Sequence, residues 1–177
     1  MKTENSAPDL VDGSDLVDGV VARFAVERPD IAGDLVETVC RLIVAGRRMQ
    51  ARGARIVAAM GGHYTDFDVL GTLRTAGPPH ELTPADLMEQ VMITSGAMTA
   101  CLNRLERERL VVRRVDETDR RVRRIRLTET GRALADKALT ERFADAARIL
   151  DGLDAQTLRT LNALLRDVSE RADTGRE

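Results

Sequence analysis

Residues 82–131 decide the fold, and they read LTPADLMEQVMITSGAMTACLNRLERERLVVRRVDETDRRVRRIRLTETG. Thr83 is a residue type that commonly caps a helix N-terminus, Pro84 suits the first helical position, and Asp86 completes a capping box. These residues predict a short helix that ends near Val91. A tight turn separates this helix from the next.

The second helix of the stretch is predicted over residues 95–109, with Thr94 as its N-cap. One face is apolar and suits packing against a core; it holds Met98, Cys101, Leu102 and Leu105. The opposite face holds small or polar residues, namely Ser95, Gly96, Thr99, Ala100 and Asn103. Such a face lets a helix lie deep in a DNA major groove, which is about 12 Å wide. The pair of helices therefore predicts a helix-turn-helix.

A basic β-hairpin is predicted next in the chain. Residues 111–115 and 122–127 read as strands, and residues 116–119 read as the turn between them. Seven arginines and three acidic residues fall within residues 111–126. Arginines along the strands suit contacts with DNA phosphates, and an arginine at the tip suits a narrow minor groove. A helix-turn-helix followed by such a hairpin predicts a winged helix-turn-helix.

Helices are predicted on both sides of this lobe, so the fold class is expected to be mainly α with the small β-hairpin as its wing. Residues 34–60 carry an apolar seam with alternating spacings of four and three. Further helices are predicted over residues 129–150 and 154–171. The predicted organisation is a disordered leader at 1–15, an extension helix at 16–33, flanking helices at 34–62 and 128–172, and a winged lobe at 63–127.

The distribution of charge is more informative than its total. The chain has 27 basic and 29 acidic residues and a net charge of −2. Residues 1–37 hold three basic and nine acidic side chains, whereas residues 101–132 hold eleven arginines and six acidic side chains. The basic middle of the chain therefore favours a polyanionic partner although the chain as a whole is slightly acidic.

The composition argues against several classes of protein. The sequence contains no run of about 18 apolar residues, so it predicts no transmembrane helix. Its acidic N-terminus does not resemble a signal peptide, and we therefore expect a cytoplasmic protein that binds no membrane. Two cysteines cannot form a disulfide framework, and His63 and His80 lack the spacing of a metal site. We therefore expect no metal and no cofactor. The sequence has no phosphate loop, nucleophile elbow or zinc-protease motif, which argues against an enzyme.

The middle of the chain resembles the DNA-binding core of the MarR family of transcriptional regulators. The resemblance is carried by Asp119-Arg-Arg121, by Leu127-Thr128-x-x-Gly131, and by residues 94–99 and 105–114. In element order it extends over residues 34–172. It implies a homodimer, in which the helices at 34–62 and 128–172 are dimerisation helices.

The resemblance also implies a function. Such a homodimer is expected to bind a pseudo-palindromic operator in double-stranded DNA, and to repress transcription until a small-molecule effector releases it. Arg121 matches the wing-tip arginine that enters the minor groove, and Asp119 matches the acid that orients the wing. With the residues of the helix face, the expected DNA-binding set is Ser95, Gly96, Thr99, Asn103, Arg113, Arg120, Arg121 and Arg123.

The N-terminal extension resembles that of the urate-responsive branch of the family. The likeness lies in residues 16–34, which include ERPD, and Phe24 stands where that branch usually has a tryptophan. Asp68 fits an acid of that branch's pocket, and it also suits the capping of a helix that begins at Thr65. The basic residue common in the middle of the recognition helix is absent here.

A small anionic or aromatic effector is expected to bind in a cleft beside the winged lobe. The residues that suit such a cleft are Arg48, Met60, Tyr64, Phe67 and Asp68. The arginine would bind a carboxylate of the effector. The other interpretation of these residues is ordinary core for the apolar ones and solvated surface for the arginine.

Two other functions stay open. Cys40 aligns with the reactive cysteine of the organic-hydroperoxide-sensing branch, where Tyr64 also matches a tyrosine, so a repressor that senses thiol oxidation is one alternative. The other interpretation of Cys40 is a small residue buried in a helix seam. A winged-helix module that binds protein or RNA is an alternative of another class, although Ser95, Thr99 and Asn103 suit base edges better than a protein surface.

Overall fold

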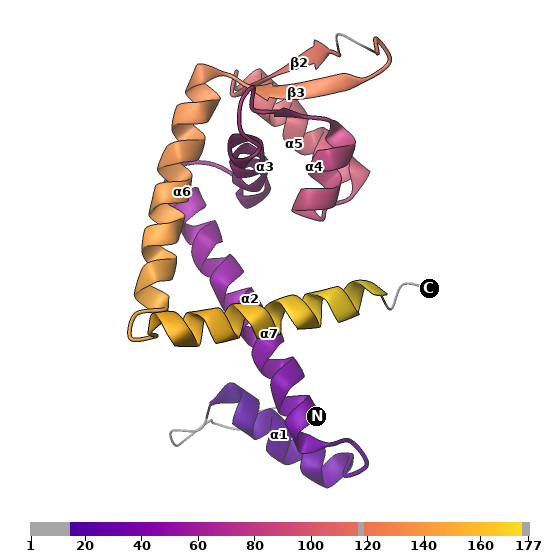
Figure 1. Cartoon of the computed structure of the whole chain (residues 1–177), viewed down its shortest axis with the longest axis vertical. Helices are drawn as coiled ribbons and strands as arrows, with labels where there is room; N and C mark the ends of the chain where they lie inside the picture. Colours follow the sequence, from indigo (N-terminus) through magenta and orange to yellow (C-terminus); the bar gives the residue numbers. More distant parts are fainter. Residues whose placement is uncertain (1–14, 117–118, 175–177) are drawn as a thin grey trace, which may run out of the picture. The chain divides into compact units, whose positions relative to one another are not determined.

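The structure is a computed structural model that describes residues 15–116 and 119–174 (Figure 1). The predicted leader lies outside the described residues except for Asp15. The elements in chain order are α1 (Leu16–Glu27), α2 (Gly33–Ala59), α3 (Tyr64–Thr75), β1 (Glu81–Leu82), α4 (Pro84–Val91), α5 (Ser95–Arg107), β2 (Val111–Val115), β3 (Arg123–Leu127), α6 (Glu129–Ile149) and α7 (Ala155–Thr174). The fold is thus mainly α with a small antiparallel sheet, as predicted. The chain divides into two units, before and after the junction of residues 55 and 56.

The first unit joins α1 to the start of α2 through a cluster of charges. The carboxylate of Asp15 caps α1 by accepting from the backbone of Val17, which is buried. Arg41 on α2 donates to Asp15 at 2.6 Å and to Asp18 at 2.7 Å, and it also bonds Glu37 one turn away at 2.7 Å. The hydrogen bond from Arg41 lowers the pKa of Asp15. One guanidinium therefore fastens the extension helix to the helix that follows it.

The apolar seam of α2 is exposed in the single chain. Its exposed members include Leu35, Val39, Leu42 and Met49. On α1, Leu16 and Phe24 are exposed as well. Within the described residues of the first unit, each of these helices therefore presents apolar surface to its surroundings.

The second unit contains the main core, which α3, α4, α5 and the sheet enclose. Among its fully buried side chains are Leu70, Leu73, Leu87, Met98, Leu105 and Ile125. All four residues predicted for the apolar face of α5 are buried. The capping box at Thr83 is formed as predicted, since its hydroxyl accepts from the N–H of Asp86 and the Asp86 carboxylate accepts from the N–H of Thr83.

The wing hairpin is part of a three-stranded sheet with the strand order β1-β3-β2. In the register of β2 with β3, Val111 pairs with Leu127 and Val115 pairs with Arg123. The strand β1 was not predicted, because two residues are too short for any alternation of side chains to be visible in the sequence. It is held to β3 by the pairing of Glu81 with Arg126.

The start of α6 explains why a threonine and a glycine stand in the motif Leu-Thr-x-x-Gly. The Thr128 hydroxyl accepts from the N–H of Gly131 at 3.0 Å and donates to the carbonyl of Arg109 at 2.8 Å. A Cβ atom at Gly131 would lie 1.9 Å from the carbonyl oxygen of Leu110. Only glycine therefore lets α6 begin against the turn between α5 and β2.

One predicted helix start is wrong. The helix α3 begins at Tyr64, with His63 as its N-cap, so Thr65 lies inside the first turn and does not cap it. The carbonyl of His63 accepts from the N–H groups of Asp66 and Phe67. Asp68 is then no capping partner, and its carboxylate instead binds Arg142 on α6.

The helices α6 and α7 are separated by a turn at Gly152, whose φ of 87° lies in the left-handed region. An apolar stripe on α7 is largely exposed, and it includes Leu161, Leu165 and Val168. Within residues 15–116 and 119–174, no helix is long and apolar enough to cross a membrane.

Candidate nucleic-acid interface

The helix-turn-helix is formed by α4 and α5. Met92 follows α4 with a φ of 55°, in the left-handed region that turns the chain sharply. Thr94 then caps α5, since its hydroxyl accepts from the N–H of Ala97 at 3.3 Å. The predicted reading residues Ser95, Gly96, Thr99 and Asn103 are all exposed on α5.

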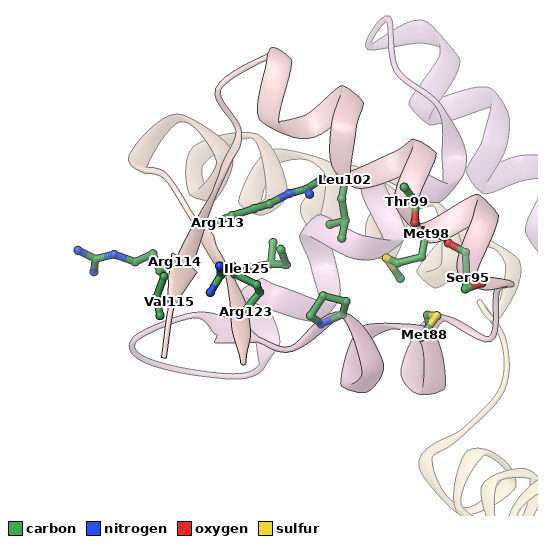
Figure 2. A pocket seen from close by; sticks show the side chains of 11 residues that line it. Met88, Ser95, Met98, Thr99, Leu102, Arg113, Arg114, Val115, Arg123 and Ile125 are labelled. Carbon is green, nitrogen blue, oxygen red and sulfur yellow. Dashed lines mark hydrogen bonds between the residues drawn. The ribbon is translucent and has the colours of Figure 1, made fainter. Parts of the chain in front are cut away.

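A groove of about 330 Å³ separates this face from the wing (Figure 2). Ser95 and Thr99 line it from α5, and Arg113, Arg114 and Arg123 line it from the two strands. Figure 2 shows Arg113 extending from its strand toward Leu102, whereas Arg114 extends away from the helix. The fold therefore brings predicted residues of the helix and of the wing to one surface.

The wing tip is organised by two carboxylates. Asp119 accepts from the N–H of Arg121 at 2.9 Å, and its own N–H donates to Asp116 at 3.0 Å. Asp116 is buried and also accepts from the guanidinium of Arg124 on β3. The predicted tip residues Arg120 and Arg121 are exposed. The carboxylate of Asp119 thus sets the backbone at Arg121, while residues 117 and 118 of the predicted turn lie outside the described part of the chain.

At its root the wing is joined to α5 by Arg113. The Nη2 atom of Arg113 donates to Oδ1 of Asn103 at 2.5 Å, and Nε lies 3.2 Å from a carboxylate oxygen of Glu106. Asn103 and Glu106 are three residues apart on the helix and so share one of its faces. Two residues of the predicted DNA-binding set, one on each element, are therefore hydrogen-bonded to each other.

Behind the exposed face, α5 is anchored to α3 by an ion pair that the sequence did not indicate. Arg104 donates to both carboxylate oxygens of Asp66, at 2.9 and 2.5 Å, and the Asp66 side chain is only 6% exposed. Beside it the thiol of Cys101 lies 3.9 Å from the carbonyl of Thr65, and burial raises the pKa of this thiol. Cys101 is therefore a core residue, as predicted.

Four of the five predicted effector residues come together where α3 packs against α6. Phe67 is buried in a small cluster against which Met60 and Tyr64 pack. Arg142 of α6, which the sequence did not indicate, donates to Asp68 at 2.8 Å and to the Tyr64 hydroxyl at 2.9 Å. Its guanidinium also lies over the Tyr64 ring, 5.4 Å from the ring centre.

Burial raises the pKa of the Asp68 carboxyl, and the hydrogen bond from Arg142 opposes part of that rise. Burial likewise raises the pKa of Tyr64. The cluster therefore holds a desolvated carboxylate against a single guanidinium that is itself 46% exposed.

The remaining predicted residues lie in the first unit. Arg48 is exposed on α2, and Cys40 is half-buried on the same helix. In the part of the chain that the structure describes, no three histidine, cysteine, aspartate or glutamate side chains gather as metal ligands.

Comparison with known proteins connects this architecture to a family. A family model described as the MarR family matches residues 63–122. The transcriptional regulator PecS of Dickeya dadantii is 27% identical over 154 residues, which cover 87% of this chain and 93% of PecS. An HTH-type transcriptional regulator of Bacillus cereus is 34% identical over 108 residues, which cover 60% of this chain and 69% of that protein.

A solved structure shows the same fold. Sco3205 of Streptomyces coelicolor, a MarR family regulator whose structure was determined in complex with DNA, superposes with a TM-score of 0.71. It is 19% identical, and the match covers 79% of this chain and 88% of that one. The matched segment 63–122 runs from α3 into the wing and so contains the helix-turn-helix. Members of this family are transcriptional regulators and not enzymes. The chain therefore belongs to the MarR family of winged helix-turn-helix transcriptional regulators.

Proposed function

We propose that the chain acts in the cytoplasm as a homodimeric repressor that binds a pseudo-palindromic operator and leaves it on binding a small anionic or aromatic effector. The observation that carries the proposal is the shared surface of α5 and the wing, with uncharged polar residues on the helix and arginines on the strands. Base edges are read by short polar side chains, whereas phosphates are bound by arginine.

On this proposal each element has its own part of the DNA. Ser95, Gly96, Thr99 and Asn103 face the major groove, because they form the exposed side of α5. Arg121 enters the minor groove from the wing tip, where Asp119 holds its backbone. Arg120 at the tip and Arg123 on β3 lie along the phosphate backbone, and Arg113 takes part at the root of the wing, where it is bonded to Asn103.

Support for the homodimer comes from apolar surface. The α2 seam and the α7 stripe leave leucine, valine and methionine side chains exposed in the single chain. Monomeric proteins rarely leave long apolar surfaces of this kind uncovered. A second copy of the chain would cover both, and a two-fold dimer would present two α5 helices to two half-sites about one DNA turn apart.

The effector is proposed to bind at the cluster of Tyr64, Asp68 and Arg142. A carboxylate on the effector competes with Asp68 for the guanidinium, and its aromatic ring packs near Tyr64. Asp68 lies two residues from Asp66, the residue of α3 that anchors α5 through Arg104. A shift of α3 on effector binding is therefore passed to the recognition helix by an ion pair.

Titration of the chain into DNA from upstream of its own gene tests the proposal. We expect a complex with two chains per operator whose affinity falls steeply as salt is raised. The same titration is repeated with sequences selected from a random pool. The proposal would be contradicted if neither DNA forms a salt-sensitive complex below micromolar concentration.

A further inference from the structure

The hydrogen bond between Arg113 and Asn103 restricts what Asn103 can offer to a base. An arginine side chain has hydrogen-bond donors and no acceptor, so the group of Asn103 that faces it is the oxygen Oδ1. The bond is 2.5 Å long and its donor is charged, which makes it stronger than a bond between neutral groups. The side-chain oxygen of Asn103 therefore points toward the wing, and the NH2 group of the same amide is left to contact DNA.

An asparagine that reads adenine must turn both ends of its amide to the base, the oxygen toward N6 and the nitrogen toward N7. Guanine has a different edge, since its O6 and N7 atoms both accept. An amide that presents only N–H groups can bond to both acceptors of guanine, whereas on adenine it meets one acceptor, N7, and leaves the N6 donor without a partner.

We propose that Arg113 sets the base preference of this regulator by fixing the amide of Asn103, so that Asn103 reads a guanine in each half-site. Arg113 is then a positioning residue and not a phosphate contact. Its Nε atom is already paired with Glu106 at 3.2 Å, which offsets its charge at the root of the wing. The inference rests on the proposed DNA-binding function and concerns its specificity.

Arg114 provides the matched control. It is the next residue of β2, it is exposed, and Figure 2 shows it extending away from α5. If Arg114 contacts phosphate, its replacement by methionine lowers affinity for all sequences alike and reduces the salt slope by about one. Arg113→Met is expected to leave the salt slope nearly unchanged, because its guanidinium is bound by groups of α5.

The experiment uses the full chain and operators selected from random DNA. Each guanine of the selected half-site is replaced in turn by 7-deazaguanine, which lacks the N7 acceptor, and each adenine by 7-deazaadenine. We expect one guanine at which this change weakens wild-type binding about fivefold or more, and at which Asn103→Ala shows no further loss.

The variants of Arg113 complete the test. Arg113→Met releases the amide of Asn103, so we expect the preference for guanine over adenine at the identified base to fall about fivefold or more. Arg113→Lys is expected to retain this preference, because lysine also offers only hydrogen-bond donors. Thermal unfolding of each variant checks that the fold is intact, and we expect an unchanged midpoint because the substituted residues are exposed.

Three results would overturn the inference. The first is coupling of Asn103 to an adenine. The second is no coupling at any base. The third is a uniform loss of affinity in Arg113→Met with a salt slope reduced as in Arg114→Met. Failure of the wild-type chain to select any sequence would instead show that the proposed function itself is wrong.

Discussion

Arg104 of the recognition helix and Asp66 of α3 form a two-point ion pair, with both carboxylate oxygens within 2.9 Å of the guanidinium. The pair joins α5 to α3, and Arg104 points to a different side of the helix from the exposed residues Ser95, Thr99 and Asn103. Arg104 therefore positions α5 through α3, while those three exposed residues are uncharged.

Asp66→Asn should destabilise the protein, because it leaves the guanidinium of Arg104 without its carboxylate at a largely buried site. Since Arg104 retains some exposure, we expect a loss of about 1–3 kcal/mol in the free energy of unfolding. Urea unfolding measures it. Asp136→Asn breaks the exposed pair with Arg74 and should cost less than about 1 kcal/mol. Equal losses in the two variants would show that the burial of Asp66 has no energetic consequence.

Gly131→Ala and Gly96→Ala should have opposite effects. At Gly131 the new Cβ would meet the Leu110 carbonyl oxygen at 1.9 Å, so the start of α6 must move, at a cost of about 1–3 kcal/mol or more. At Gly96 no described atom lies within 4 Å of the Cβ position. Gly96→Ala should keep or slightly raise thermal stability, because alanine favours a helix, while it weakens binding to the operator. A stable Gly131→Ala protein would contradict the close packing described here.

Asp86→Asn should show a stability loss that depends on pH. The N–H of Thr83 holds the pKa of the Asp86 carboxyl below its ordinary value of 3.8. The carboxylate therefore contributes stability above that value, and the contribution is lost as pH falls through the lowered pKa. We expect a cost of about 1 kcal/mol at pH 7 that shrinks below about pH 4, measured by urea unfolding across that range. A cost that does not change with pH would mean that the charge of Asp86 is irrelevant to the cap.

Arg121→Ala should weaken operator binding about tenfold or more, because an arginine at the wing tip meets the concentrated negative potential of a narrow minor groove. Asp119→Ala should weaken binding to a smaller extent, since it removes the acceptor that holds the N–H of Arg121 but leaves the guanidinium. Fluorescence anisotropy with labelled operator measures both. Unchanged operator affinity in Arg121→Ala would show that the wing tip does not contact the DNA.

Arg142→Met should abolish the response to an aromatic carboxylate and leave operator binding intact, because the proposed effector site lies away from the DNA-binding face. Benzoate is a suitable first probe, with release of labelled operator as the measurement. Cys40→Ser serves as the comparison, since it should respond to benzoate as the wild type does. Release by peroxide from wild type but not from Cys40→Ser would favour thiol oxidation as the signal instead.

Much of the helix-turn-helix was predictable because its signals are local. Thr83 and Thr94 each cap the helix that the sequence assigned to them, and each cap depends on residues no more than three positions away. The apolar face of α5 was equally visible, because helical spacing alone determines which of its residues share a side.

The contacts that the sequence did not reveal join distant positions. Arg104 and Asp66 are 38 residues apart, and Arg142 and Asp68 are 74 residues apart. In a chain with 32% charged residues, any aspartate has many candidate arginines, and only the packing of α3 against α5 and α6 selects one. The same ambiguity led to Asp68 being assigned to a cap, because an acidic residue three positions after a threonine fits that role as well.

On the proposed function, the uncharged exposed residues of α5 from Ser95 to Asn103 and the arginines of the wing act at different stages of operator binding. In that proposal the arginines of the wing attract any duplex, so they govern how fast the protein arrives and how readily it slides along DNA. The exposed residues from Ser95 to Asn103 exert no long-range force and act only once the groove is entered, so they govern how long the protein stays. A change of base preference in α5 can therefore arise without a change in search speed, and descendants of this chain could acquire new operators one helix residue at a time.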